Sequence, residues 1–122
     1  MNVKRHASVI RLRAGKTEEY RRLHAAVWPE VLATITACGI RNYSIFVGRL
    51  DDGRDYLFSY FEYHGKDLRA DLARMAADPA TRNWWTHTEP LQEPLANRAE
   101  GDWWAAMEEV FHHPGQASPA GR

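Results

Sequence analysis

Three ring side chains spaced four residues apart, Tyr20, His24 and Trp28, stand near the N-terminus. An α-helix turns about 100° per residue, so side chains at positions i and i+4 lie on the same face. That face normally carries the apolar side chains that pack on a core. Here it offers a phenol, an imidazole and an indole, and an imidazole exchanges protons near neutral pH with little tuning. The spacing therefore indicates a pocket wall with His24 as its acid–base group.

A structural interpretation of His24 is also open. A lone histidine on an inward helix face is commonly a hydrogen-bonded, partly buried residue without a catalytic role. The neighbours favour the pocket, because Tyr20 and Trp28 lie one turn before and one turn after His24 and surround its imidazole with ring and hydroxyl groups.

Tryptophan is abundant, and four of the five tryptophans form the adjacent pairs Trp84-Trp85 and Trp103-Trp104. Packing in a core or an interface explains at least one ring of each pair, because neighbouring helix residues point about 100° apart. Flat indoles beside polar groups are also typical of sugar sites, where the apolar C–H face of a pyranose lies on the ring. The pairs are therefore candidates for packing and for sugar binding.

Other kinds of site find little support. His64 and His87 are isolated, the neighbours His112 and His113 would point to opposite faces of a strand, and no histidine pair has the i, i+4 spacing of a helical zinc site. The sequence contains no glycine-rich phosphate loop, no serine nucleophile motif and no Cys–His arrangement. We therefore expect neither a metal nor a phosphate-bearing cofactor.

Composition narrows the class of protein. The 122 residues suffice for one domain, and 16 basic residues balance 16 acidic ones, so we expect no nucleic-acid partner. No apolar run approaches the ~20 residues of a membrane span, and the N-terminus has no signal-peptide core. The single cysteine, Cys38, fits a reducing cytoplasm. We expect one domain over residues 1–113 and a polar tail over residues 114–122, in a cytoplasmic protein without membrane contact.

The elements that must position these residues follow from the periodicity of apolar residues. Thr17 is a plausible N-cap for a helix that runs through Trp28, where Pro29 either kinks it or opens a second helix that ends at Gly39. The turn Asp51–Asp55 indicates a hairpin. The expected order is a strand at 5–13, helical residues 18–38, strands at 40–50 and 56–63, a helix at 65–79, a short helix at 80–90, a loop at 91–102 and a last strand around 107–111.

This order, β-α-β-β-α-β, predicts an α+β fold of the ferredoxin-like split-βαβ type, with an antiparallel sheet and its helices on one face. One side of the second strand carries Tyr43, Ile45 and Val47, and one side of the third strand carries Tyr56, Phe58 and Tyr60. Both faces of such a sheet are too apolar for water. We therefore expect a homodimer of the dimeric α/β-barrel type, in which two sheets meet face to face.

Four sequence blocks resemble the signature of a known family. They are Tyr20-x3-His24-x3-Trp28-Pro29-Glu30, then Asn42-Tyr43-Ser44-Ile45-Phe46, then Trp84-Trp85, then Glu109-Val110-Phe111. In this order and at this spacing they resemble the L-rhamnose mutarotases, over roughly residues 5–111. The first and third blocks together are the most specific.

The resemblance implies a small cytoplasmic dimer with a ferredoxin-like subunit that needs no cofactor and interconverts the α and β anomers of a 6-deoxy-hexose. By position, His24 matches the family's proton donor, and Tyr20, Tyr43, Trp84 and Trp85 match its substrate-contacting residues. The segment 96–107 departs from the family in being longer and richer in tryptophan, and the tail after residue 113 has no counterpart. L-Fucose, which carries the same terminal methyl group, is therefore an alternative substrate.

Two further hypotheses belong to other classes. Dimeric ferredoxin-like domains with buried His and Trp also serve as cofactor-free oxygenases of aromatic compounds, which is an analogy of fold alone. A non-catalytic ligand-binding or dimerisation module, with His24 as a core residue, is the other. A panel of deoxy-sugars tested for anomer exchange separates the three.

Overall fold

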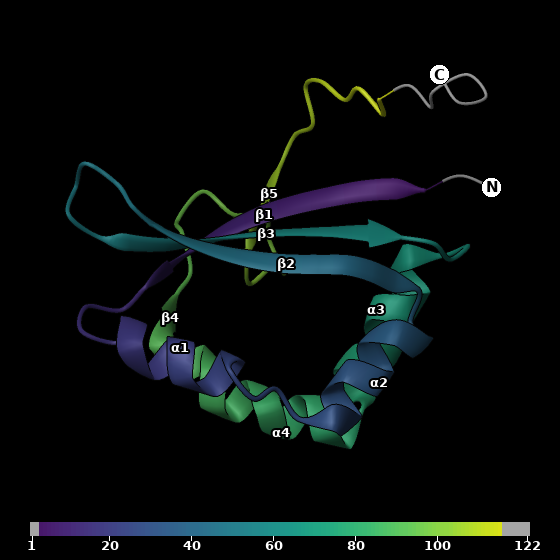
Figure 1. Ribbon diagram of the computed structural model, residues 1–122, viewed down its shortest axis with the longest axis horizontal. Helices are drawn as coiled ribbons and strands as arrows, with labels where there is room; N and C mark the ends of the chain where they lie inside the picture. Colours follow the sequence, from purple (N-terminus) through teal and green to yellow (C-terminus); the bar gives the residue numbers. More distant parts are fainter. Residues whose placement is uncertain (1–2, 116–122) are drawn as a thin grey trace, which may run out of the picture.

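The computed structural model describes residues 3–115 as one sheet above a layer of helices (Figure 1). The strands are β1 Lys4–Leu12, β2 Ile40–Arg49, β3 Asp55–Tyr63, β4 Gln92–Glu93 and β5 Ala105–Met107. The helices are α1 Thr17–His24, α2 Pro29–Ala37, α3 Leu68–Ala77 and α4 Pro79–Thr88, followed by the 3₁₀ helix η1 Glu89–Leu91. Most of the predicted polar tail, residues 116–122, lies outside the described residues. No helix within residues 3–115 is long and apolar enough to cross a membrane.

The sheet has the strand order β2-β3-β1-β4, with β5 also pairing with β1, and every pairing is antiparallel. All four α-helices lie below the sheet in Figure 1, and the upper face carries none of them. Because side chains alternate along a strand, Leu57, Ser59 and Phe61 of β3 face the helices. The intervening Phe58 and Tyr60 therefore face outward. The predicted α+β fold is confirmed.

The last strand of the pattern is divided into two short pieces. β4 pairs with Arg11 and Leu12 of β1, whereas β5 pairs with the stretch from Ala7 to Val9. The loop 94–104 leaves the sheet edge between these pieces. Our prediction of one last strand around residues 107–111 was wrong, since β5 ends at Met107 and Phe111 lies beyond it, 80% exposed. Pairings of two or three residues are too short to give a periodic sequence signal.

Two helix boundaries also differ from prediction. α1 ends at His24, and Trp28 is an extended residue (φ −62°, ψ 135°) that precedes Pro29 at the first position of α2. Trp28 therefore does not share the face of α1 with His24, because the residue before a proline is restricted to extended conformations. The N-cap of α1 is Lys16, and the hydroxyl of Thr17 instead donates a hydrogen bond to the Asp55 carboxylate, at 2.5 Å.

The interior contains two clusters of buried apolar side chains between the sheet and the helices. The first holds Ile10, Leu12, Tyr20, Leu57 and Leu91, and the second holds Cys38, Ile40 and Met75. Residues of both clusters also border one large cavity. The space between sheet and helices is therefore only partly filled by the chain's own side chains.

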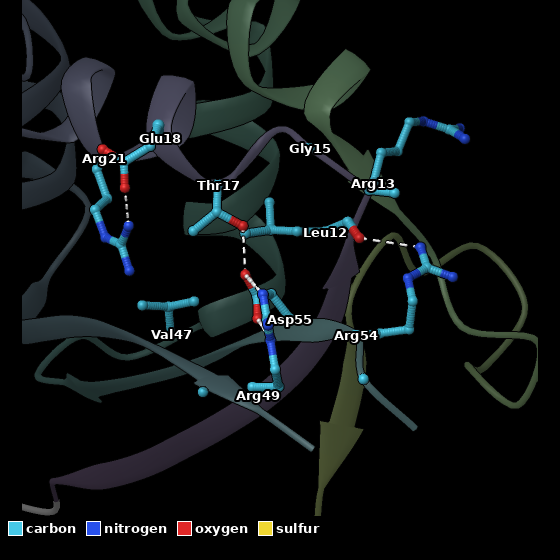
Figure 2. Close-up of a pocket in the computed structure, with 13 residues that line it drawn as sticks. Leu12, Arg13, Gly15, Thr17, Glu18, Arg21, Val47, Arg49, Arg54 and Asp55 are labelled. Carbon is cyan, nitrogen blue, oxygen red and sulfur yellow. Dashed lines mark hydrogen bonds and ion pairs between the residues drawn. The ribbon is translucent and has the colours of Figure 1, made fainter. Parts of the chain in front are cut away.

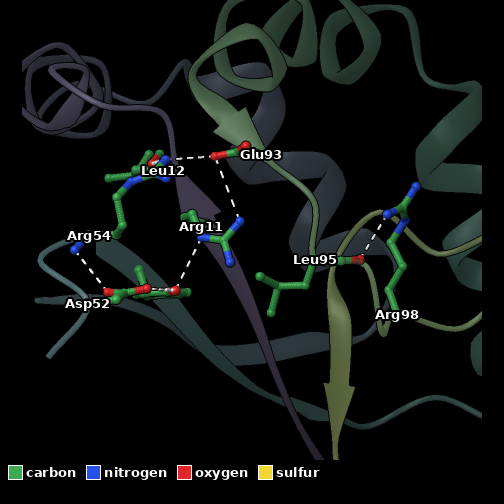
Figure 3. A network of polar contacts seen from close by, with 8 residues as sticks. Arg11, Leu12, Asp52, Arg54, Glu93, Leu95 and Arg98 are labelled. Carbon is green, nitrogen blue, oxygen red and sulfur yellow. Dashed lines mark hydrogen bonds and ion pairs between the residues drawn. The ribbon is translucent and has the colours of Figure 1, made fainter. Parts of the chain in front are cut away.

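A polar network anchors the β2–β3 turn to the neighbouring strands (Figure 3). The Arg54 guanidinium donates to the Glu93 carboxylate of β4 at 2.7 Å, and the Arg11 guanidinium of β1 donates to the Tyr56 hydroxyl at 3.2 Å. That hydroxyl in turn donates to Asp52 in the turn, at 2.5 Å. These bonds connect β1, β3, β4 and the turn at one end of the sheet.

Candidate active site

All five residues predicted from the sequence to form a site line one cavity. Its volume is about 1020 Å³, at the upper end of the usual range of small-molecule sites, about 300–1,000 Å³. Tyr20 and His24 enter it from α1, Tyr43 from β2, and Trp84 and Trp85 from α4. Segments distant in the sequence therefore bring a titratable imidazole, two phenols and two indoles to the same hollow.

His24 is held in one tautomer by a backbone group. Its Nδ1 lies 3.0 Å from the carbonyl oxygen of Tyr20, and a carbonyl only accepts, so Nδ1 carries the hydrogen and donates it. Nε2 then has a free lone pair and no hydrogen-bond partner among the described residues. Burial lowers the pKa of His24, with the hydrogen bond to Tyr20 opposing this shift to a smaller extent. At neutral pH the ring is therefore a neutral base with an available nitrogen.

Aromatic contacts fix the plane of this imidazole. The Tyr20 ring stacks on it, with 4.1 Å between ring centroids, and Trp84 meets it edge-on at 5.3 Å. Trp28, although outside α1, supports Trp84 from behind with an edge contact at 5.1 Å. The predicted contact of Tyr20 with His24 is thus found, whereas the prediction that Trp28 shares this wall was wrong, because Trp28 contacts Trp84 and His87 and does not line the cavity.

The two phenols remain protonated across the physiological pH range. Burial raises the pKa of Tyr20 far above its ordinary value, and the nearby Tyr43 contributes to the same shift. Tyr43 is 43% exposed as a residue, and desolvation of its hydroxyl by the surrounding protein raises its pKa as well. Both hydroxyls therefore serve as neutral hydrogen-bonding groups.

A β-bulge directs Tyr43 into the cavity. The pairing of β2 with β3 shifts between Arg41 and Ser44, and Asn42 at this point has the left-handed backbone value φ 51°. An extra residue in one strand changes which face the following side chains occupy. Ile40 before the bulge and Tyr43 after it can therefore both face the helices.

The indoles of α4 form another wall. Trp84 is buried, and Trp85 is partly buried beside it. Both line the cavity, although neighbouring helix residues diverge by about 100°. The first tryptophan pair therefore combines the two roles expected for it, since Trp84 packs on His24 and Trp28 while both rings border the hollow.

Comparison with known proteins identifies the family. Residues 5–113 match the family model described as L-rhamnose mutarotase. The L-rhamnose mutarotase of Listeria monocytogenes serotype 4b is 35% identical over 80% of this chain and 88% of its own, and that of Burkholderia ambifaria is 40% identical over 69% and 85%. The chain belongs to the L-rhamnose mutarotase family. This confirms the resemblance and places the chain among isomerases.

A solved structure agrees with the fold of this mutarotase family member. The crystal structure of L-rhamnose mutarotase FA22100 from Formosa agariphila superposes with a TM-score of 0.66 at 24% identity. The superposition covers 90% of this chain and 98% of the other. Family membership favours the mutarotase hypothesis over the oxygenase and the non-catalytic module.

Several residues that line the mutarotase cavity were not predicted. The hydroxyls of Ser8 and Ser59 lie 2.5 Å apart on the inner face of β1 and β3, and Gln92 enters from β4. The role of Trp103 and Trp104 was open, and both prove to line the cavity. Ser8 and Ser59 could have been predicted as cavity residues, because each is a serine at an inward position of an otherwise apolar strand. For Gln92 there was no such signal, because its stretch was read as a loop.

A second hollow of about 540 Å³ lies beside the start of α1, at the end of the β2–β3 hairpin (Figure 2). Arg49 pairs there with Asp55, at 2.9 Å, and Arg21 pairs with Glu18. The hollow contains none of the residues that match the mutarotase signature, and its four arginines outnumber its two carboxylates, Glu18 and Asp55. Within residues 3–115, no three His, Cys, Asp or Glu side chains are grouped so as to hold a metal ion.

Proposed function

We propose that this chain is an L-rhamnose mutarotase that interconverts the α and β anomers by opening and reclosing the pyranose ring, with His24 as the proton carrier. The observation that carries the proposal is the neutral His24 ring, with an Nε2 that has no partner among the described residues, in a cavity lined by two phenols and four indoles. Tyr20, Tyr43, Trp84 and Trp85 are the proposed sugar-contacting residues.

The proton balance of the reaction needs one carrier. Opening a cyclic hemiacetal breaks the bond between C1 and the ring oxygen, and one proton moves from O1 to the ring oxygen. Nε2 of His24 accepts the O1 proton, and the resulting imidazolium delivers a proton to the ring oxygen. After rotation about the C1–C2 bond, the ring closes from the other face and the transfers run in reverse. Such acid–base catalysis contributes about 10²–10⁴-fold, which matters for a reaction that also proceeds slowly in water.

The other residues position the sugar. The phenols of Tyr20 and Tyr43 stay neutral because burial raises the pKa of each, so they hydrogen-bond sugar hydroxyls without competing for the catalytic proton. The indoles of Trp84 and Trp85 supply flat apolar surface for the C–H face of the ring and for the C6 methyl group. This division of roles requires no cofactor.

We also propose that the protein is a homodimer formed through the outer face of the sheet. That face presents Phe46, which is 63% exposed, and Met107, which is 47% exposed. The chain after β5 extends above the same face (Figure 1), where Val110 and Phe111 are 87% and 80% exposed. Apolar side chains gathered on one face are typical of an interface. A second copy supplies a matching sheet and a matching extension, as two-fold symmetry requires.

A cytoplasmic location is proposed with this function. Cys38, the only cysteine in the sequence, is free and buried, which suits a reducing compartment.

The test is anomer exchange in freshly dissolved α-L-rhamnose, followed by NMR or polarimetry. We expect the wild-type protein to accelerate exchange and His24→Ala to lose about 10²-fold or more of that acceleration while keeping a native circular dichroism spectrum. His113→Ala is the matched control, because His113 is exposed and lies outside the cavity. L-Fucose, tested in parallel, ranks the two sugars. No acceleration with either sugar would contradict the function, and a wild-type rate in His24→Ala would contradict the role of His24.

A further inference from the structure

A chain of hydrogen bonds runs from the loop 94–104 to the Tyr20 hydroxyl. The indole Nε1 of Trp103 donates to Oε1 of Gln92 at 2.7 Å, and Nε2 of Gln92 donates to the hydroxyl oxygen of Tyr20 at 3.3 Å. Gln92 is 3% exposed, so water does not compete for its amide. The three side chains come from the loop, β4 and α1.

The donors and acceptors in this chain can be assigned in only one way. An indole N–H only donates, so the group facing Trp103 must be the oxygen of the Gln92 amide. The NH₂ group therefore faces Tyr20, and because NH₂ also only donates, the Tyr20 oxygen accepts. The single hydrogen of the Tyr20 hydroxyl is then not used by Gln92. No other hydrogen bond of this hydroxyl is formed with the described residues, so its hydrogen is available to the cavity.

The divided sheet edge explains how Trp103 reaches Gln92. β4 and β5 pair with neighbouring parts of β1, and the loop between them projects from the sheet edge and returns to it. Gln92 lies just before this loop and Trp103 lies near its end, which places them side by side. The loop 94–104 thus supplies the indole N–H.

We infer that Gln92 is a positioning residue, held in one amide orientation by Trp103, which makes Tyr20 a hydrogen-bond donor toward the sugar. This inference rests on the proposed mutarotase function. It follows that the sugar atom facing the Tyr20 hydroxyl is an oxygen that accepts a hydrogen bond from it. Gln92 does not touch the reacting atoms and acts through Tyr20.

The decisive variant is Gln92→Glu, which keeps the shape of the side chain and replaces the donor NH₂ group that faces Tyr20 with an acceptor oxygen. A carboxylate accepts from both neighbours, so the Tyr20 hydrogen would turn toward it and away from the sugar. We expect kcat/KM for anomer exchange at pH 8 to fall about tenfold or more relative to wild type. When the introduced carboxyl group is protonated, it can again donate to Tyr20. The ratio of variant to wild-type rate should therefore rise as the pH falls from 8 to 5.5.

The ratio of the variant rate to the wild-type rate separates titration of the introduced carboxyl group from titration of the other groups in the cavity. The charged or titratable side chains that line the cavity are Tyr20, Arg21, His24, Arg41, Tyr43, Glu89 and Asp102. Among them, His24 has an ordinary pKa inside the tested range, about 6.5. A negative charge at position 92 raises the pKa of His24 in the variant, which lowers the ratio toward acid, so a rise of the ratio reports protonation of the introduced carboxyl group.

A double-mutant cycle tests whether Gln92 acts through Tyr20. In the Tyr20→Phe background there is no hydroxyl to orient, so Gln92→Glu should cause little further loss and no pH-dependent recovery. A purely structural role for Gln92 predicts the same loss in both backgrounds and a ratio that does not recover at low pH. Either of those results would overturn the inference.

A measurement without sugar tests the hydrogen-bond chain directly. Deuterium exchange of the Trp103 indole N–H, followed by NMR, should be about tenfold or more faster in Gln92→Met than in the wild-type protein, because methionine offers no carbonyl oxygen. Equal exchange rates would contradict the hydrogen bond from Trp103 to Gln92. A wild-type protein that accelerates no anomer exchange would refute the proposed function, and with it the positioning role. Acceleration by the wild type with a pH-independent Gln92→Glu ratio would refute the positioning role alone.

Discussion

The properties of His24 come from one backbone hydrogen bond and a half-buried site. The Tyr20 carbonyl accepts from Nδ1, which leaves Nε2 as the reactive nitrogen, and the stacked Tyr20 ring prevents the imidazole from turning. Both constraints come from a residue one helical turn earlier. The i, i+4 spacing of Tyr20 and His24 thus determines both the tautomer and the position of the imidazole. Trp84 contacts the same ring edge-on.

The pH dependence of the reaction follows from the same residue. Burial lowers the pKa of His24 from its ordinary value of 6.5, and the neutral form is the base that starts ring opening. We therefore expect kcat/KM, corrected for the rate without enzyme, to level off at alkaline pH, where His24 is fully neutral. It should fall toward acid with a midpoint below the ordinary value of 6.5, as His24 becomes protonated. A midpoint above pH 7 would mean that the site stabilises the imidazolium, contrary to its burial.

At the scale of elements, the bulge in β2 decides which residues reach the cavity. Asn42 adopts φ 51°, a conformation that asparagine tolerates and β-branched residues do not, and its side-chain amide donates to the Glu62 carboxylate at 2.8 Å. Without the extra residue, Tyr43 would lie on the outer face of the sheet and its neighbours in β2 would face the cavity. The bulge is therefore a requirement of the site and not a defect of the sheet.

Substitution of Asn42 tests this conformation. We expect Asn42→Val to lower the free energy of unfolding by about 1–3 kcal/mol, because a β-branched residue is strained at positive φ. Asn42→Gly loses the hydrogen bond to Glu62 but adopts positive φ freely, so its cost should stay within about 1 kcal/mol. Urea unfolding of both variants provides the comparison. Equal losses would show that the hydrogen bond, and not the backbone conformation, is what matters at this position.

At the scale of the whole molecule, the two faces of the sheet have separate roles. The inner face and the helices enclose the cavity, whereas the outer face exposes Phe46 and Met107 and lies below the extension that carries Val110 and Phe111. The extension is connected to the sheet by Arg5, whose guanidinium donates two hydrogen bonds of 3.0 Å to the Glu109 carboxylate. This arrangement supports the proposed homodimer, in which a second copy covers the outer face.

The oligomeric state is the corresponding prediction. We expect wild-type protein to sediment as a dimer and Phe46→Glu to shift it toward monomer, because a carboxylate would be buried in an apolar interface without a partner. Leu32→Glu is the matched control, since Leu32 is 50% exposed on α2 in the helical layer, and it should remain a dimer. A monomeric wild-type protein, or a Phe46→Glu variant that stays fully dimeric, would refute the proposed interface.

The sequence by itself predicted the order of the elements from β1 to α4 and the five residues that line the candidate site, whereas it placed Pro79 at the end of a helix and not at the start of α4. These features are local, because the i, i+4 spacing of Tyr20 and His24 and the alternation in β3 depend only on neighbouring residues. The sequence also carried the resemblance to the L-rhamnose mutarotases, which the comparisons confirmed.

Only the tertiary structure decided where the site receives its remaining residues. The bulge at Asn42, the division of the edge strand into β4 and β5, and the contact of Trp103 with Gln92 depend on pairing between segments far apart in the chain. The register of two strands, and the point at which a loop rejoins the sheet, depend on which backbone groups of the partner strand are free to pair. Neighbouring residues in the sequence do not contain this information. For the same reason the sequence left the role of Trp103 open, while the folded chain places its indole N–H on the amide that orients Tyr20.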